Sequence, residues 1–360
     1  MTRVLHVIPQ HDRSGAVAQA ALVASAVGAS CDMLSLRLGV DLPWRGGFDL
    51  RGWRLLDEAV RERQPDVIHS WLAADDCWTL WMLARQRRAP VVASWRDRES
   101  WPIAWWPRFV SHRVSRIVVP TVGLSEAFAA QRIDAARLTV VPDLLPELDR
   151  DSGALPNEMA ALLPVDALLI VAVGRWRWSD HWRELMWAAD LLKFLHLPVH
   201  LVLCGEGEDV ARLERYRRQI EIVDRVHLRP IAEAAQWLDR AQVCWSLRDD
   251  PGVSPELLRA MQRGVPVVAS QTGDHARLIT DRHNGFLVPH GSRADLAKRA
   301  LQLHEDPGLA ERIAAAARKT VQDRQTHAAA VAQWQQIYAS LSSGVSGAAP
   351  GGGVPPPLRM

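Results

Sequence analysis

Residues 168–175 read LLIVAVGR, and this stretch decides the fold class. An unbroken apolar run ends directly in Gly174 and Arg175, which is typical of a strand that is buried on both faces and opens into a loop. A second run of this kind, VHLVLCGEG, follows at residues 199–207. Strands of this type belong to parallel sheets, so the pattern indicates an α/β fold with helices covering the sheet.

The same alternation of short apolar runs and longer helical patterns occupies both halves of the chain. In the first half we expect strands at residues 4–8, 66–69, 90–94, 116–120 and 138–141. In the second half further strands are expected at residues 225–228, 243–246 and 265–270. Helical patterns fill the gaps, so each half predicts one doubly wound, Rossmann-like domain.

A chain of 360 residues is longer than a typical domain with a single core, so the length also favours two domains. The segment 143–163 contains prolines and acidic residues without a sustained period, so we expect it to link a first domain at 1–142 to a second at 164–324. A helix at 325–341 is expected to pack back on the first domain. The glycine- and proline-rich segment 342–360 lacks apolar content and is predicted to be disordered.

The composition excludes several classes of protein. A formal net charge of +2 rests on 43 basic and 41 acidic side chains, which gives no electrostatic footprint for nucleic acid. The four cysteines lie far apart, and no Cys/His cluster in the sequence indicates a metal site or a disulfide framework. No segment is long and uncharged enough to span a bilayer. We therefore expect a cytoplasmic protein that is at most peripheral on the inner face of the membrane.

Several short motifs of the second half occur in a fixed order. VGR at 173–175 is followed by LVLCGEG at 201–207, GVPVVAS at 264–270 and NGFLVP at 284–289. This order closely resembles the donor domain of the family 4 retaining glycosyltransferases, glycosyl transferases group 1, and the resemblance extends from Arg3 to Ser342. It implies a GT-B fold, in which two Rossmann-like domains face a central cleft. It also implies hexosyltransferase-like transfer from a nucleotide-diphosphate sugar with retention, without a metal or cofactor.

The resemblance assigns the first domain to the acceptor and the second to the donor. The residues themselves predict a helix that begins near residue 254, because Ser254 suits an N-cap, Pro255 the first helical position and Glu256 the positive end of the helix dipole. An ordinary capped helix that packs on the core is one interpretation, and the order of the family motifs favours an anion site instead. The free N–H groups of such a helix end attract a diphosphate. Arg175 follows a strand directly, where a guanidinium can hold phosphate oxygens in a bidentate manner.

These arguments yield the candidate site residues. The donor-binding candidates are Gly15, Gly174, Arg175, Gly252, Val253, Ser254 and Arg259. Arg175 and Glu256 are the catalytic candidates, and His69, Trp95 and Arg96 are the acceptor-side candidates. A strand-end histidine such as His69 is at least as often a hydrogen-bonded structural residue. No residue is assigned to a metal.

Four positions depart from the family pattern. Pro251 and Arg259 stand where paired glutamates are expected, and Asp180 stands where a lysine would hold the diphosphate. Arg96 replaces a histidine of the first domain, and an arginine cannot exchange protons near neutral pH. These departures leave an alternative open, a catalytically degenerate relative that binds a glycan, a nucleotide or a protein. The sequence argues against an oxidoreductase of the Rossmann type, because it lacks the GxGxxG fingerprint of a dinucleotide-binding loop.

The acceptor is expected to be a glycan, a lipid-linked molecule or a small molecule. Trp95, Trp101, Trp105 and Trp106 lie among several arginines in a region that the resemblance places near the acceptor. This mixture suits stacking on sugar rings or contact with a membrane interface. Packing of an amphipathic helix on the core explains it equally well.

Overall fold

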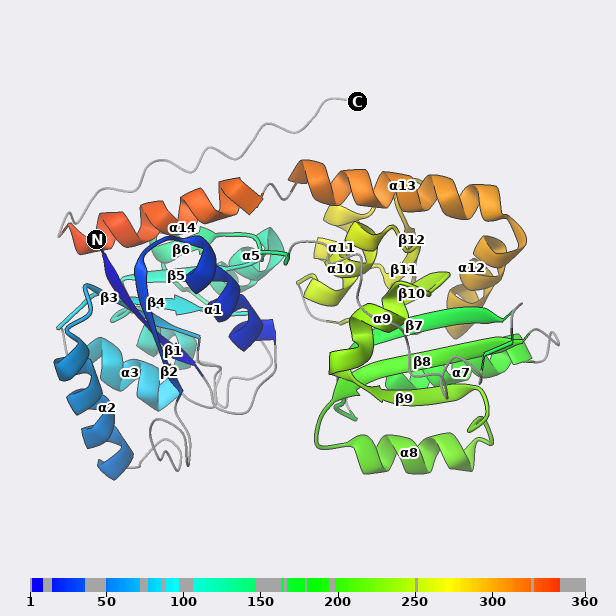
Figure 1. The fold of residues 1–360 in the computed structure, drawn as a ribbon, viewed down its shortest axis with the longest axis horizontal. Helices are drawn as coiled ribbons and strands as arrows, with labels where there is room; N and C mark the ends of the chain where they lie inside the picture. The colour runs from blue at the N-terminus through cyan, green and yellow to red at the C-terminus, as the bar shows by residue number, and fades with distance from the viewer. Residues whose placement is uncertain are drawn as a thin grey trace. The chain divides into compact units, whose positions relative to one another are not determined.

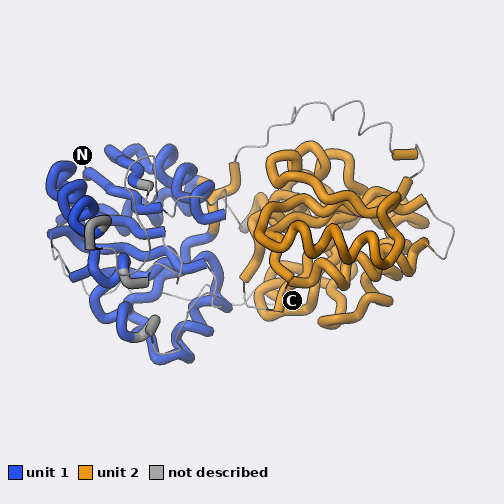
Figure 2. The backbone as a smooth tube through the Cα atoms, turned by 90° about the horizontal axis from the view of Figure 1, so that it is seen from below, with its two compact units in different colours: residues 1–142, 328–360 blue, residues 143–327 orange. Residues whose placement is uncertain are grey.

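The computed structural model describes residues 2–8, 15–35, 50–71, 77–85, 88–96, 106–146, 163–164, 167–178, 180–193, 198–249, 252–324 and 327–343. The chain forms two compact units, which Figure 2 colours separately: residues 1–142 with 328–360, and residues 143–327. Most of the predicted linker and nearly all of the predicted disordered tail lie outside the described residues.

The first unit is built on a six-stranded parallel sheet with strand order β2-β1-β3-β4-β5-β6 (Figure 1). Its strands are β1 (Arg3–Ile8), β2 (Ser30–Ser35), β3 (Val67–Ser70), β4 (Val91–Ser94), β5 (Arg116–Val119) and β6 (Leu138–Val140). The helices are α1 (Gly15–Ala26), α2 (Leu50–Arg63), α3 (Cys77–Arg85), α4 (Trp106–Ser111) and α5 (Val122–Ala130), with a 3-10 turn η2 (Ala135–Arg137). Five of the six strands were predicted; β2, at the edge of the sheet, was not.

The second unit repeats the architecture with strand order β12-β11-β10-β7-β8-β9, again all parallel. Its strands are β7 (Leu168–Arg175), β8 (Val199–Glu206), β9 (Val226–Pro230), β10 (Val243–Ser246), β11 (Val267–Ser270) and β12 (Phe286–Val288). The helices are α7 (Trp182–Lys193), α8 (Val210–Gln219), α9 (Ala234–Leu238), α10 (Pro255–Arg263), α11 (Gly273–Leu278), α12 (Arg293–Glu305) and α13 (Pro307–Arg324), with a 3-10 turn η3 (Ile231–Glu233). The predicted α/β class, with one parallel sheet in each half, is confirmed.

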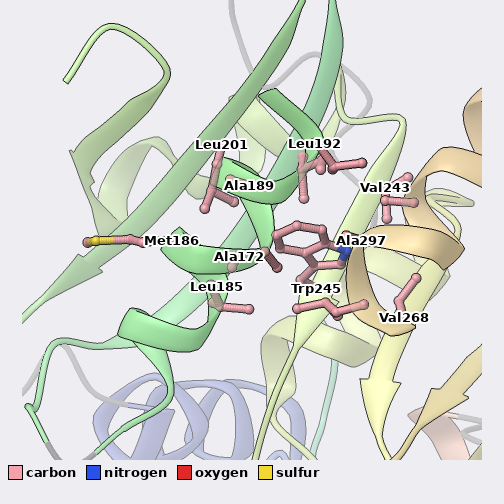
Figure 3. Packing of buried hydrophobic residues seen from close by; sticks show 14 of the residues in the cluster. Ala172, Leu185, Met186, Ala189, Leu192, Leu201, Val243, Trp245, Val268 and Ala297 are labelled. Carbon is pink, nitrogen blue, oxygen red and sulfur yellow. The ribbon is translucent and has the colours of Figure 1, made fainter. Parts of the chain in front are cut away.

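The sheet of the second unit divides its core into two apolar layers. Alternate residues of β7 face opposite sides, so Ile170 belongs to one cluster and Val171 to the other. The first cluster packs α7 and α12 against the sheet, and Figure 3 shows the buried indole of Trp245 between α7 and Ala297. The second cluster packs α9, α10 and α13 on the other face. Burial on both faces explains why β7 and β8 are continuous apolar runs in the sequence.

The helix α14 (His327–Ser342) belongs to the first unit from Ala328 onward. Gln335 donates a hydrogen bond from Nε2 to the carbonyl of Val27 at 3.0 Å. Trp334 and Tyr338 are buried, and the Trp334 ring lies 4.9 Å from the ring of His69. The last described helix of the chain therefore covers part of the first sheet. Among the described residues, no helix combines the length and apolarity needed to cross a bilayer.

Candidate functional site

The carboxyl ends of the second sheet bring several candidate residues to one edge. Because all six strands run parallel, the loops after β7, β10, β11 and β12 leave the sheet on the same side. Ligands of open α/β sheets bind at this edge. Arg175 is the last residue of β7 and is exposed there, directly after Gly174.

The loop after β7 is held by hydrogen bonds from three directions. The backbone N–H of Trp176 donates to the carbonyl of Glu206 at 2.8 Å. The indole N–H of Trp182 donates to the carbonyl of Arg175 at 2.9 Å. The N–H of Trp178 donates to Oδ2 of Asp209 at 2.8 Å. The backbone that carries Arg175 is therefore fixed before any ligand arrives.

The glycines of the GEG stretch at the end of β8 pack against this same loop. A Cβ added to Gly205 would lie 2.3 Å from the carbonyl oxygen of Gly174, and one added to Gly207 would lie 2.3 Å from the carbonyl oxygen of Trp176. Real Cβ atoms do not approach backbone oxygens so closely, so the residues must be glycine for the two loops to pack. The GEG stretch thus has a packing role.

The helix α10 begins as its sequence predicts. The Oγ atom of Ser254 accepts a hydrogen bond from the N–H of Leu257 at 3.1 Å, and Pro255 occupies the first turn. Gly264 ends the helix in the left-handed conformation, with φ of 74°. Gly252 lies two residues before Ser254 and has a φ of 133°, a conformation that residues other than glycine rarely adopt. The dipole of such a helix end is suited to an anion.

Two charged side chains of α10 lie near this end. Glu256 is in the first turn and is half-buried. Arg259 lies one turn further along, and its buried Nε has no hydrogen-bond acceptor within the part of the chain that the structure describes. Val253 is half-buried against the apolar cluster below, so it contributes packing as well as backbone. Pro251, at the position of the first expected glutamate, lies outside the described residues.

The sequence of this chain matches two protein-family models, one in each unit. The family model described as Glycosyl transferases group 1 matches residues 167–306, and the model described as Glycosyltransferase Family 4 matches residues 35–143. The chain belongs to the family 4 and group 1 glycosyltransferases.

Individual relatives of this chain agree with the family models. The D-inositol 3-phosphate glycosyltransferase of Streptomyces bingchenggensis is 28% identical over 176 residues, which cover 43% of this chain and 37% of that protein. The matches span less than half the length of the curated relatives. A structure of HepE from Anabaena in complex with UDP and glucose is similar with a TM-score of 0.78 and 16% identity, over 95% of this chain and 100% of that one. Sucrose-phosphate synthase from Thermosynechococcus elongatus gives a TM-score of 0.74 at 16% identity, over 96% and 100% of the two chains. These likenesses confirm the predicted GT-B fold.

In the first unit, His69 lies in the protein interior. Its side chain is fully buried, Nε2 lies 2.8 Å from Oγ of Ser94, and Nδ1 lies 2.7 Å from the hydroxyl of Tyr338. Burial, followed by the neighbouring His6, holds the pKa of His69 well below its usual value, so the imidazole is neutral. Of the two interpretations left open by the sequence, the structure favours the hydrogen-bonded structural one.

The other first-unit candidates differ in their surroundings. Trp95 is buried in the core, with its ring 5.2 Å from that of Phe128, which favours core packing over sugar stacking. Arg96 follows it and is half-buried. Gly15 opens α1 and is half-buried. Trp101 and Trp105 lie outside the described residues, so their predicted contact with an acceptor or a membrane is not described by the structure.

One group of side chains was not predicted as a site. His181, Asp249 and His290 follow β7, β10 and β12, and one ligand atom from each lies within 4.8 Å of the others. No short motif joins them, because they are far apart in the sequence. The only available signal was their common position after strands of one parallel sheet.

Proposed function

We propose that this chain transfers a sugar from a nucleotide-diphosphate sugar to an acceptor, with retention at the anomeric carbon. The observation that carries the proposal is the pairing, on one sheet edge, of the rigidly held Arg175 with the capped N-terminus of α10. Both lie within the residues matched by the group 1 family model. The UDP and glucose described for HepE support a nucleotide-sugar donor.

The chemistry follows from where negative charge develops. As the bond between the sugar and the diphosphate breaks, charge accumulates on the departing phosphate oxygens. The Arg175 guanidinium can pair with two of these oxygens, and the positive end of the α10 dipole at Ser254 can favour the charge on others. Fixed donors of this kind each contribute about 3 to 4 kcal/mol to a transition state. We propose that this step needs no metal.

The remaining candidates are proposed to line the donor site or to contact the donor. Gly15, Gly174 and Gly252 have no side chain and allow close approach of the donor to the backbone. Glu256 is the carboxylate of the α10 first turn, and we propose that it accepts hydrogen bonds from sugar hydroxyls. Arg259, which replaces a glutamate, cannot accept such bonds, and we propose that its guanidinium faces phosphate oxygens instead.

We propose that the acceptor is a glycan, a lipid-linked molecule or a small molecule, and that it binds near Arg96. His69 and Trp95 are left out of this acceptor site because both are buried in the first unit. The family match and the nucleotide-containing structural neighbours favour a transferase over a non-catalytic binding module.

The test is a panel of UDP-, GDP- and ADP-sugars in which release of the nucleoside diphosphate is measured with the folded protein. We expect turnover with at least one donor, and a loss of roughly 100- to 1000-fold in kcat for Arg175→Ala. Arg215→Ala, which removes an exposed arginine of α8, is the matched control and should leave kcat unchanged. A folded protein that neither hydrolyses any donor nor binds any nucleoside diphosphate would overturn the proposal.

A further inference from the structure

Three side chains of the second unit converge at the carboxyl edge of its sheet. Nε2 of His181 lies 2.9 Å from Oδ1 of Asp249, and Nε2 of His290 is in contact with the same carboxylate oxygen. The two imidazole rings are 4.9 Å apart and nearly perpendicular, with an interplanar angle of 82°. Two imidazole nitrogens and a carboxylate oxygen therefore point at one small volume.

Each of these residues is held by the backbone beside it. The carbonyl of His181 accepts the hydrogen bond of Leu185, at the start of α7. The residue before Asp249 is fixed by the buried Ser270, whose Oγ accepts from the N–H of Arg248 at 2.8 Å and donates to its carbonyl at 2.9 Å. His290 lies in the short turn between β12 and α12. The three ligands thus come from three separate connections that follow strands of one sheet.

We propose that His181, Asp249 and His290 form a binding site for a divalent transition-metal ion, with Zn²⁺ as the best fit. Two histidines and one carboxylate are a frequent donor set for Zn²⁺ and related ions of intermediate softness. Three protein ligands leave at least one coordination position open. The second nitrogen of His181, Nδ1, lies 3.9 Å from Oε2 of Glu184, so a carboxylate faces the outer side of that ligand as it does in many metal sites.

The arrangement differs from an ordinary surface ion pair in its geometry. One carboxylate oxygen meets two imidazole nitrogens at once, and the rings approach it from perpendicular directions. The side chain of His181 is only 14% exposed, whereas Asp249 and His290 are about half exposed at 51% and 55%. The site is thus anchored on one side and open to solvent or ligand on the other.

The position of the site indicates which ligand would occupy its open coordination position. This step rests on the proposed function. The indole of Trp182, the neighbour of His181, donates to the carbonyl of Arg175. Asp180 stands where the family resemblance implies a phosphate-binding lysine. A bound cation would return positive charge to this edge, and its open position would take a phosphate oxygen of the donor. In the transfer step Arg175 still stabilises the departing diphosphate, and the cation strengthens binding of the donor.

The first experiment measures metal binding alone, on the full chain after removal of metals with a chelator. Calorimetric titration with Zn²⁺ should show one site, and Co²⁺ should give the visible absorption of nitrogen and carboxylate coordination. Asp249→Ala and the double variant of His181→Ala with His290→Ala should each weaken Zn²⁺ binding more than 100-fold, beyond the effect of losing an outer partner. His283→Ala, which removes an exposed histidine of the 281–285 turn, should change nothing. No binding by folded wild type, or equal binding by the double variant, would overturn the site.

The second experiment measures UDP affinity with and without Zn²⁺. Affinity should rise at least threefold with the metal in wild type, and not in the double histidine variant. Unchanged UDP affinity beside intact metal binding would refute the donor contact and leave the metal site standing. Absence of binding for UDP, GDP and ADP alike under both conditions would count against the proposed function, while the Zn²⁺ titration would still decide the site.

Discussion

Nδ1 of His69 and the hydroxyl oxygen of Tyr338 lie 2.7 Å apart, although 269 positions separate them in the chain. Both side chains are buried, and the second ring nitrogen of His69 is bonded to Ser94. This contact joins the centre of the first sheet to α14. It also shows how a histidine that looked like an active-site candidate in the sequence is used to hold the fold together.

Removing the Tyr338 hydroxyl should destabilise the first unit. Tyr338→Phe leaves one buried nitrogen of His69 without its hydrogen bond, which costs about 1 to 3 kcal/mol. Urea unfolding followed by fluorescence would measure the loss. Tyr216→Phe removes a hydroxyl from the side of α8, where it is bonded to Trp187 on the protein surface, and should cost less than about 1 kcal/mol. Equal losses for the two variants would refute the structural role of the buried bond.

Acid should weaken the protein through His6. Burial lowers the pKa of His6 to about 4, whereas an unfolded chain has a histidine pKa of about 6.5. The unfolded state therefore binds the proton first as the pH falls, so the free energy of unfolding should drop by roughly 3 kcal/mol between about pH 7 and pH 4 from this group. His6→Gln should flatten this part of the profile, while the exposed-site variant His112→Gln should keep it. An unchanged profile in His6→Gln would exclude His6 as the cause.

A methyl group at Gly207 should disturb the Arg175 loop. The added Cβ would lie 2.3 Å from the Trp176 carbonyl oxygen, so Gly207→Ala must move backbone and should cost about 1 to 3 kcal/mol. If Arg175 binds the donor, affinity for UDP should fall together with stability. Gly308→Ala, in the first turn of α13, adds a methyl group with ordinary contacts and should leave the melting temperature unchanged or slightly raised.

Loss of the α10 cap should affect binding more than an equivalent cap elsewhere. Ser254→Ala removes the acceptor of the Leu257 N–H and should cost about 1 kcal/mol of stability. Thr121→Ala removes the matching cap of α5 in the first unit, where the hydroxyl accepts from Leu124. Calorimetry with UDP should show weaker binding for Ser254→Ala alone. Equal UDP affinities in the two variants would argue against the α10 terminus as the phosphate site.

Local features of this protein were predictable because short stretches determine them. The doubly buried strands β7 and β8 were visible as apolar runs, and the Ser254 cap was visible as a Ser-Pro-Glu start. The edge strand β2 reads SCDMLS, which mixes polar and apolar residues because only one side of it pairs with the sheet, and it was missed.

Features that join distant segments were not predictable in the same way. The contact between His69 and Tyr338 depends on where α14 packs, and the cluster of His181, Asp249 and His290 depends on the order of strands in the sheet. A single sequence shows neither. The donor candidates Arg175 and Arg259 could be named from the family resemblance, but their roles stay predictions.

The return of α14 to the first unit has a consequence for folding during synthesis. The ribosome completes β1 to β6 early, yet the helix that covers His69 and Trp71 emerges only after the whole second unit has been made. Until then the first unit carries an exposed aromatic and histidine surface. A chain truncated before residue 327 should therefore aggregate or recruit chaperones even though every strand of both sheets is present.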